Sequence, residues 1–128
     1  MPGSNLVRWL PALAQAGAIF ALSSQPDLRI APDPLLDFLI RKAAHITVFG
    51  ILAVLLCYAV SDRMGGRRVL VVAFVATCLY AVTDEVHQGF VAGRTTSPLD
   101  VIVDSIGAGL GVAGWSARER RRPMHRAD

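Results

Sequence analysis

The chain has 128 residues, of which 53% are hydrophobic and 18% are charged, and its formal net charge is +3. This length fits one domain, but the apolar share is higher than in ordinary soluble domains, and the charges fall between apolar stretches instead of recurring within them, which favours a membrane protein. The basic charge does not indicate nucleic acid as a partner, because the Lys and Arg residues do not alternate with stacking aromatic residues along one face.

The first predicted element is an apolar helix that begins near the N-terminus. A secretory signal peptide is the alternative for this stretch, since Arg8 precedes it, although Pro11 and Gln15 interrupt its apolar run. Trp9 and Trp115 are predicted to belong to an aromatic belt at the inner membrane interface. Three further stretches are similar in length, and each of the four has about the 17–25 residues that a spanning helix needs. The four stretches are 6–22, 43–60, 69–86 and 98–115.

Local signals place the helix ends. Asp33 followed by Pro34 predicts an N-cap with proline in the first turn, so the second helix is expected to begin ahead of its apolar stretch. The pair of glycines at 65–66 predicts a turn between the second and third helices. Ser97, a proline and Asp100 resemble a capping box, which predicts the start of the fourth helix at position 98. The predicted fold is therefore an all-α, four-helix membrane protein.

The arginines between the helices predict the orientation. Segment 61–68 holds three arginines and the C-terminal segment 118–128 holds five, whereas 23–33 and 85–97 hold one each. Lys and Arg in short loops resist translocation. We therefore predict that both termini and segment 61–68 are cytoplasmic, and that segments 23–33 and 85–97 face outward. The expected organisation is a membrane domain over 1–117, followed by a basic cytoplasmic tail.

With this topology most ionisable side chains gather near the outer face. Asp104 is the clearest of them, because it lies one turn beyond the cap and a charge at the centre of a membrane helix costs about 2.5–3.5 kcal/mol on insertion scales. Gly107 and Gly111 continue its face, which predicts the close approach of another helix. The cluster consists of Lys42, His45, Asp84, Glu85, His87, Gln88, Arg94, Asp100 and Asp104.

Two cations and four carboxylates give this cluster a formal charge of −2 when both histidines are neutral. A partly buried site does not hold such a charge without compensation. Either a carboxylate keeps its proton, a histidine gains one, Arg41 approaches the cluster, or a cationic ligand binds.

Structural roles are the alternative for several of these residues. Lys42 and Arg94 are expected to snorkel to the interface if they have no other task, and Asp100 is then a capping residue. The histidines would be interfacial hydrogen-bonding groups. Cys57 and Cys78 fall inside apolar stretches and are expected to be packing residues, so they predict neither a disulfide nor a redox site.

The segment 84–94 has the sequence DEVHQGFVAGR and is followed by Ser, Asp and Gly at spaced positions. This pattern resembles the VanZ-like family of bacterial membrane proteins. The stretches 23–26 and 41–45 are similar to two other recurring parts of that family. The resemblance implies a four-helix membrane fold. It also implies a place in the cell envelope, because the founding member is tied to low-level resistance to teicoplanin, a glycopeptide that binds peptidoglycan precursors at the outer face. This chain differs in having Val48 and Phe49 where Glu and Tyr are common, and Asp104 where Asn is common.

Two functions remain open. The first is an accessory or binding protein that contacts an envelope component, with Arg41, Lys42 and Arg94 binding phosphate or carboxylate groups. The second is an enzyme acting on a lipid-linked envelope intermediate by carboxylate acid or base chemistry, assisted by a histidine. A proton- or ion-coupled carrier is less favoured, because no broken helix or polar path through the inner half is visible.

The candidate residues follow from these two functions. The expected partners are the lipid bilayer and a peptidoglycan precursor or another envelope lipid. The sequence has no paired-histidine motif, so we expect no metal and no cofactor. The catalytic candidates are His45, Glu85, Asp100 and Asp104, and the ligand-binding candidates are Ser24, Gln25, Lys42, Asp84, His87, Gln88 and Arg94.

Overall fold

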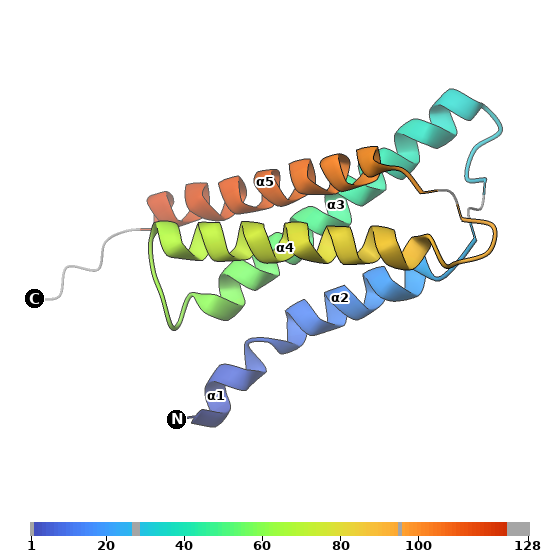
Figure 1. Ribbon diagram of the computed structural model, residues 1–128. Coiled ribbons are helices and arrows are strands. Elements are labelled where there is room, and N and C mark those ends of the chain that lie inside the picture. Colours follow the sequence, from blue (N-terminus) through green and yellow to red (C-terminus); the bar gives the residue numbers. More distant parts are fainter. Residues whose placement is uncertain (1, 27–28, 95, 123–128) are drawn as a thin grey trace, which may run out of the picture.

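The structure, a computed structural model, describes residues 2–26, 29–94 and 96–122 and is all-helical over these residues (Figure 1). The end of the predicted basic tail, 123–128, lies outside the described residues, as does position 27 of the segment predicted to face outward. The elements are α1 (Pro2–Val7), α2 (Leu10–Ser23), α3 (Pro34–Val60), α4 (Arg67–Gln88) and α5 (Pro98–Arg121).

Among the residues that the structure describes, four helical spans are long and apolar enough to cross a membrane, which confirms the predicted four-helix fold. The first span contains a break between α1 and α2. Pro11 lies in the first turn of α2, has no N–H to donate to the carbonyl of Val7, and its ring crowds that carbonyl, so the helix restarts there. The spans are Asn5–Ser23, Pro34–Val60, Arg67–Gln88 and Pro98–Arg121.

The predicted starts of α3 and α5 are confirmed. The side chain of Asp33 accepts a hydrogen bond from the N–H of Leu36 at 3.3 Å, and Ser97 accepts one from the N–H of Leu99 at 3.2 Å. Each cap satisfies one of the backbone donors that the first helical turn leaves without an intrahelical partner. α5 continues to Arg121, so the first residues after 117 extend the last helix.

The side chains are distributed inside out relative to a soluble protein. The helices present small residues to one another, such as Ala53, Ala73 and Ala81, each 0% exposed. Large apolar residues face outward instead. Membrane helices pack in this way, because lipid tails accept apolar side chains and small residues let the backbones approach. Among the exposed large apolar residues are Leu13, Leu22, Leu79, Ile102 and Leu110.

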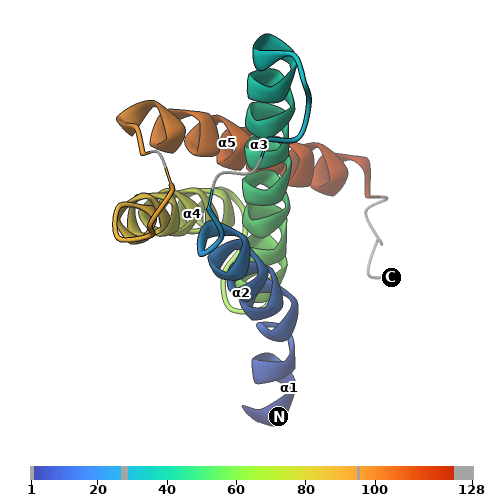
Figure 2. The same ribbon diagram turned by 90° about the vertical axis from the view of Figure 1, so that its right-hand side faces the viewer.

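α3 and α5 cross in close contact (Figure 2). A Cβ atom built on Gly107 would lie 2.5 Å from the carbonyl oxygen of Ile46, and one built on Gly50 would lie 3.1 Å from the carbonyl oxygen of Gly107. The two backbones therefore touch at this crossing. The glycine face predicted from Gly107 and Gly111 is thus the α3 contact face of α5, and it fixes how the polar ends of the two helices meet.

Trp115 differs from its expected place in a lipid-facing belt. Its side chain packs in a buried cluster with Cys57, Val60 and Ala73, and the residue is 7% exposed. The reason is the position of Trp115 on the same face of α5 as the glycines, so it fills the space where α3 and α5 diverge. Trp9 packs against the same cluster from the α2 side.

α2 is attached to α3 and α4 by hydrogen bonds within the apolar region. The side-chain amide of Gln15 donates to the carbonyl oxygen of Val48 at 3.0 Å, and the hydroxyl of Tyr80 donates to the carbonyl oxygen of Ala16 at 2.5 Å. Polar groups in a lipid environment need such internal partners. The end of α2 is therefore held beside the end of α4 and the first half of α3.

Candidate functional site

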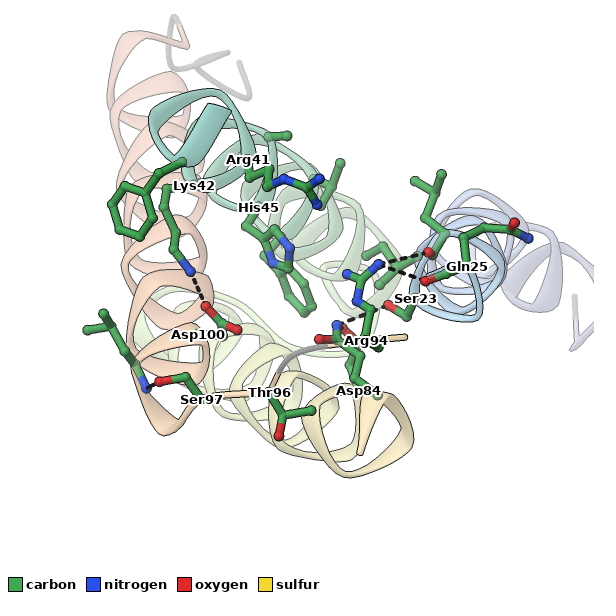
Figure 3. A pocket seen from close by; sticks show the side chains of 18 of the residues that line it. Ser23, Gln25, Arg41, Lys42, His45, Asp84, Arg94, Thr96, Ser97 and Asp100 are labelled. Atoms are coloured by element: carbon green, nitrogen blue, oxygen red, sulfur yellow. Dashed lines mark hydrogen bonds and ion pairs between the residues drawn. The ribbon is translucent and has the colours of Figure 1, made fainter. Parts of the chain in front are cut away.

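A cavity of about 610 Å³ lies where the ends of α2 and α4 meet the first turns of α5 and the first half of α3 (Figure 3). Its lining combines apolar and polar side chains. The apolar lining includes Ile19, Leu22, Phe38, Val48, Phe49 and Leu99, and the polar lining includes Ser23, Gln25, Arg41, Lys42, His45, Asp84, Gln88, Arg94, Thr96, Ser97 and Asp100.

Two polar pairs connect α3 to α5 beside this cavity. Lys42 forms an ion pair with Asp100. One helical turn deeper, Nδ1 of His45 lies 2.8 Å from Oδ1 of Asp104. Lys42 and His45 are three positions apart and the aspartates four, so each pair of residues lies on one face of its helix. The close crossing at Gly107 sets the separation at which both pairs form.

Glu85 has a structural role that the sequence did not predict. Its Oε1 accepts a hydrogen bond from the N–H of Ser97 at 2.5 Å. In a capping box that bond is made by the acidic residue three positions after the cap, which would be Asp100. Ser97 therefore caps the helix as predicted, through the N–H of Leu99, but the reciprocal bond comes from Glu85 and not from Asp100, so the capping-box interpretation is wrong. Because Glu85 supplies the bond from α4, Asp100 is left to pair with Lys42.

Asp84 and Gln88 form the α4 wall of the site. Both are buried, with 4% and 1% of their surface exposed. The amide of Gln88 donates to Oδ2 of Asp84 at 2.9 Å and to the hydroxyl of Ser23 at 3.3 Å. Oδ1 of Asp84 is buried and has no hydrogen-bond partner within the described part of the chain. A buried carboxylate oxygen in this state is costly, and it has room for a donor from a ligand or water in the cavity.

Arg94 joins the loop after α4 to the end of α2. Its Nη1 donates to the carbonyl oxygens of Gln25 at 3.1 Å and Leu22 at 3.4 Å, which belong to the last turn of α2 and the residues after it. Gly93 precedes it with φ +77°, a left-handed conformation that favours glycine. This turn points the guanidinium toward the cavity, where it forms part of the wall (Figure 3).

Ser24 and His87 lie beside the cavity and do not line it. The hydroxyl of Ser24 is 3.0 Å from Nε2 of His87, and the imidazole stacks on Phe20 with ring centroids 4.3 Å apart. This contact joins α2 to α4. Interfacial hydrogen bonding, the structural alternative considered for the histidines, fits this contact of His87 with Ser24.

The structure brings most of the candidate residues together around one space. It also adds lining residues that the sequence did not single out as ligands, namely Ser23, Thr96 and the apolar residues. For Ser23 a signal was present, because it begins the segment 23–26 that resembles a family motif. The candidates that line the cavity are Gln25, Lys42, His45, Asp84, Gln88, Arg94 and Asp100, and those that do not are Ser24, Glu85, His87 and Asp104.

The charge of the wall differs from that of the whole cluster. Arg41, on α3, also lines the cavity. Its Nε lies 2.9 Å from Oδ2 of Asp37. Two of the four clustered carboxylates, Glu85 and Asp104, are outside the lining. The wall thus carries three cations and two carboxylates when His45 is neutral, a formal charge of +1. Two of these cations are already paired with carboxylates, Arg41 with Asp37 and Lys42 with Asp100, so the wall offers cationic donors to a ligand without a large excess of positive charge.

In the described part of the chain, no group of three or more His, Cys, Asp or Glu side chains is placed so that it could bind a metal ion. The family model described as VanZ/LLP1 matches residues 4–118. No curated protein and no solved structure matches the chain.

Proposed function

This chain belongs to the VanZ/LLP1 family, and we propose that it is a multi-pass protein of the bacterial cell membrane that binds an anionic envelope lipid in the cavity at the outer leaflet. The single observation that carries the proposal is the composition of the cavity wall. Arg41, Lys42 and Arg94 provide donors for phosphate or carboxylate oxygens, while Phe38, Phe49 and their apolar neighbours accept a hydrocarbon chain.

The outward orientation is supported by the arginines. The end of the bundle away from the cavity carries Arg63, Arg67 and Arg68 in the α3–α4 connection and further arginines at the end of α5. Arg94 is the only Lys or Arg in the segment 85–97 at the cavity end. Retention of the arginine-rich end in the cytoplasm leaves the cavity on the extracytoplasmic side.

The family link to teicoplanin resistance supports an envelope role for this site. A peptidoglycan precursor at the outer leaflet is an amphiphile with an apolar chain and a polar head, which is the ligand class that the cavity wall suits. We propose that binding such a lipid, or another anionic envelope lipid, is how the protein acts in the cell envelope.

Lipid binding is expected to depend on the phosphate. The full chain in detergent micelles is titrated with farnesyl phosphate and, as the matched ligand, with farnesol, and bound lipid is counted by native mass spectrometry. We expect farnesyl phosphate to bind at least about ten-fold more tightly than farnesol, because a charge-assisted hydrogen bond contributes about 1.5–3 kcal/mol.

Variants of the chain test whether the phosphate binds in the cavity or elsewhere on the protein surface. Arg94→Gln is expected to lose about ten-fold in affinity for farnesyl phosphate. The double variant Lys42→Gln with Asp100→Asn is expected to lose as much, since it removes the cation without leaving a carboxylate alone. Arg67→Gln, at the other end of the bundle, is the control and should bind like the wild type. Equal affinity of the phosphate and the alcohol would contradict the proposal.

A second candidate function is an enzyme that acts on the same lipid-linked intermediate. The observation that favours it is the pair of His45 and Asp104. Asp104 is buried behind His45, and His45 lines the cavity. A carboxylate as the acid or base is less favoured, because Glu85 already holds the backbone of Ser97 and Asp100 already pairs with Lys42.

A further inference from the structure

The contacts of His45 are one-sided. Its Nδ1 is 2.8 Å from Oδ1 of Asp104, whose side chain is 3% exposed, whereas the side chain of His45 is 23% exposed. Nε2 makes no hydrogen bond to any other residue that the structure describes. Figure 3 shows the ring extending from α3 into the pocket that it lines.

This arrangement prepares an imidazole to accept a proton. A carboxylate that accepts the hydrogen bond of Nδ1–H fixes the tautomer in which Nε2 carries the lone pair, and it stabilises the imidazolium that forms. Asp104 is held for this by burial and by the crossing at Gly107. The geometry assigns proton transfer to Nε2, at the surface of the cavity.

A purely structural pair is the competing explanation. Such a pair would join α3 to α5 and satisfy a buried carboxylate. The pair of Lys42 and Asp100 already joins the same two helices one turn away, and a structural histidine would have no need to expose its second nitrogen to a cavity. His87, by contrast, is partly buried and has its Nε2 bound to Ser24.

The cations around the same cavity indicate the substrate. Arg41, Lys42 and Arg94 line it together with His45. Guanidinium and ammonium groups stabilise the charge that develops on the oxygens of a transferring phosphoryl group. We infer that His45 is the general base of a hydrolytic site for lipid diphosphates, with Asp104 as its positioning residue. This inference rests on the proposed function, since the same cavity must first bind the lipid.

The step consumes one water molecule. The water oxygen forms a bond to the terminal phosphorus while its proton passes to Nε2 of His45. The bond between that phosphorus and the bridging oxygen breaks, and the electron pair stays on the oxygen of the lipid monophosphate. The proton on Nε2 then passes to this oxygen, which restores neutral His45. The products are a lipid monophosphate and inorganic phosphate, and no oxidant or reductant takes part.

The test uses the full chain in detergent micelles with farnesyl diphosphate, and it measures bound lipid and released inorganic phosphate separately. The wild type is expected to bind and hydrolyse the probe. His45→Gln should lower kcat by about 100-fold while the affinity stays within two-fold of the wild type, a loss typical for a general base. Asp104→Asn should lower kcat by at least ten-fold with KM unchanged, because the amide removes the charge behind the imidazole.

A misfolded variant is distinguished from a chemically inactive one by rescue. In His45→Gly, added imidazole should restore part of the phosphate release, which cannot occur if the residue only holds α3 to α5. Thr47→Val is the matched control on α3, since this hydroxyl is exposed and bonds only to the carbonyl oxygen of Ala43, and its rate should equal that of the wild type.

Three results would overturn the inference. A wild type that binds farnesyl diphosphate but releases no phosphate would refute hydrolysis and leave the lipid-binding proposal standing. An unchanged rate in His45→Gln would remove His45 as the base. If the wild type binds neither farnesyl phosphate nor farnesyl diphosphate, the proposed function fails as well, and the inference fails with it.

Discussion

Replacement of Gly107 by alanine is expected to lower the free energy of unfolding by about 3 kcal/mol, the upper part of the range for overpacking. The new Cβ would lie 2.5 Å from the carbonyl oxygen of Ile46 and 2.9 Å from its Cα. Both neighbours are backbone atoms, so no side chain can rotate away and α3 must move from α5. The measurement is a denaturant titration in mixed micelles, followed by helical circular dichroism.

Gly114→Ala on the same helix is the control for this substitution. Nothing lies within 4 Å of a Cβ built on Gly114, so this variant should keep or gain stability, since alanine favours a helix by up to about 1 kcal/mol over glycine. Equal stability of the two variants would contradict the close crossing of α3 and α5. The crossing also determines the site, because both the Lys42 and the His45 contacts bridge these two helices.

Trp115→Ala is the second substitution with a large expected effect. This side chain fills the space between α3, α4 and α5 beside Cys57 and Val69, and its removal leaves a cavity. We expect a loss of about 3 kcal/mol in the free energy of unfolding, as for other buried aromatic residues. The same titration measures it.

Leu110→Ala is the control for this substitution. It tests whether the loss of stability comes from lost packing between helices or from the shortening of any apolar side chain on α5. Leu110 is on α5 and 60% exposed, so it packs little against the other helices and its truncation should change stability by less than about 0.5 kcal/mol. If Leu110→Ala were as damaging as Trp115→Ala, the assignment of buried and lipid-facing sides of α5 would be wrong.

Much of the fold could be predicted from local patterns. Four apolar stretches, the caps at Asp33 and Ser97 and the glycines on the face of Asp104 all depend on neighbouring residues in the chain, and the structure agrees with them. The break near Pro11 and the burial of Trp115 were not predicted. The break is a local effect of Pro11, which the sequence analysis treated only as an interruption of the apolar run. The burial of Trp115 depends on how whole helices cross, and the sequence pattern of one helix does not contain the position of the next.

The site was predictable as a cluster but not as a set of contacts. The predicted topology alone was enough to place Lys42, His45 and Asp100 in one region, because they lie near helix ends on the same side of the bundle. Which carboxylate meets which cation depends on the α3–α5 crossing. The bond from Ser97 to Glu85 also depends on the fold of the loop between α4 and α5. The change from an acidic cluster to a cationic wall follows from these contacts.

Cysteine labelling from the two sides of the membrane tests most directly the claim that the cavity serves the outer leaflet. Cys57 and Cys78, the two free thiols, are first replaced by alanine. Thr96→Cys then places one thiol at the exposed cavity wall, and Gly65→Cys places one in the α3–α4 connection at the other end. A charged, membrane-impermeant maleimide is added to spheroplasts. The account predicts labelling of Thr96→Cys in intact spheroplasts and of Gly65→Cys only after lysis, and the reverse pattern would contradict it.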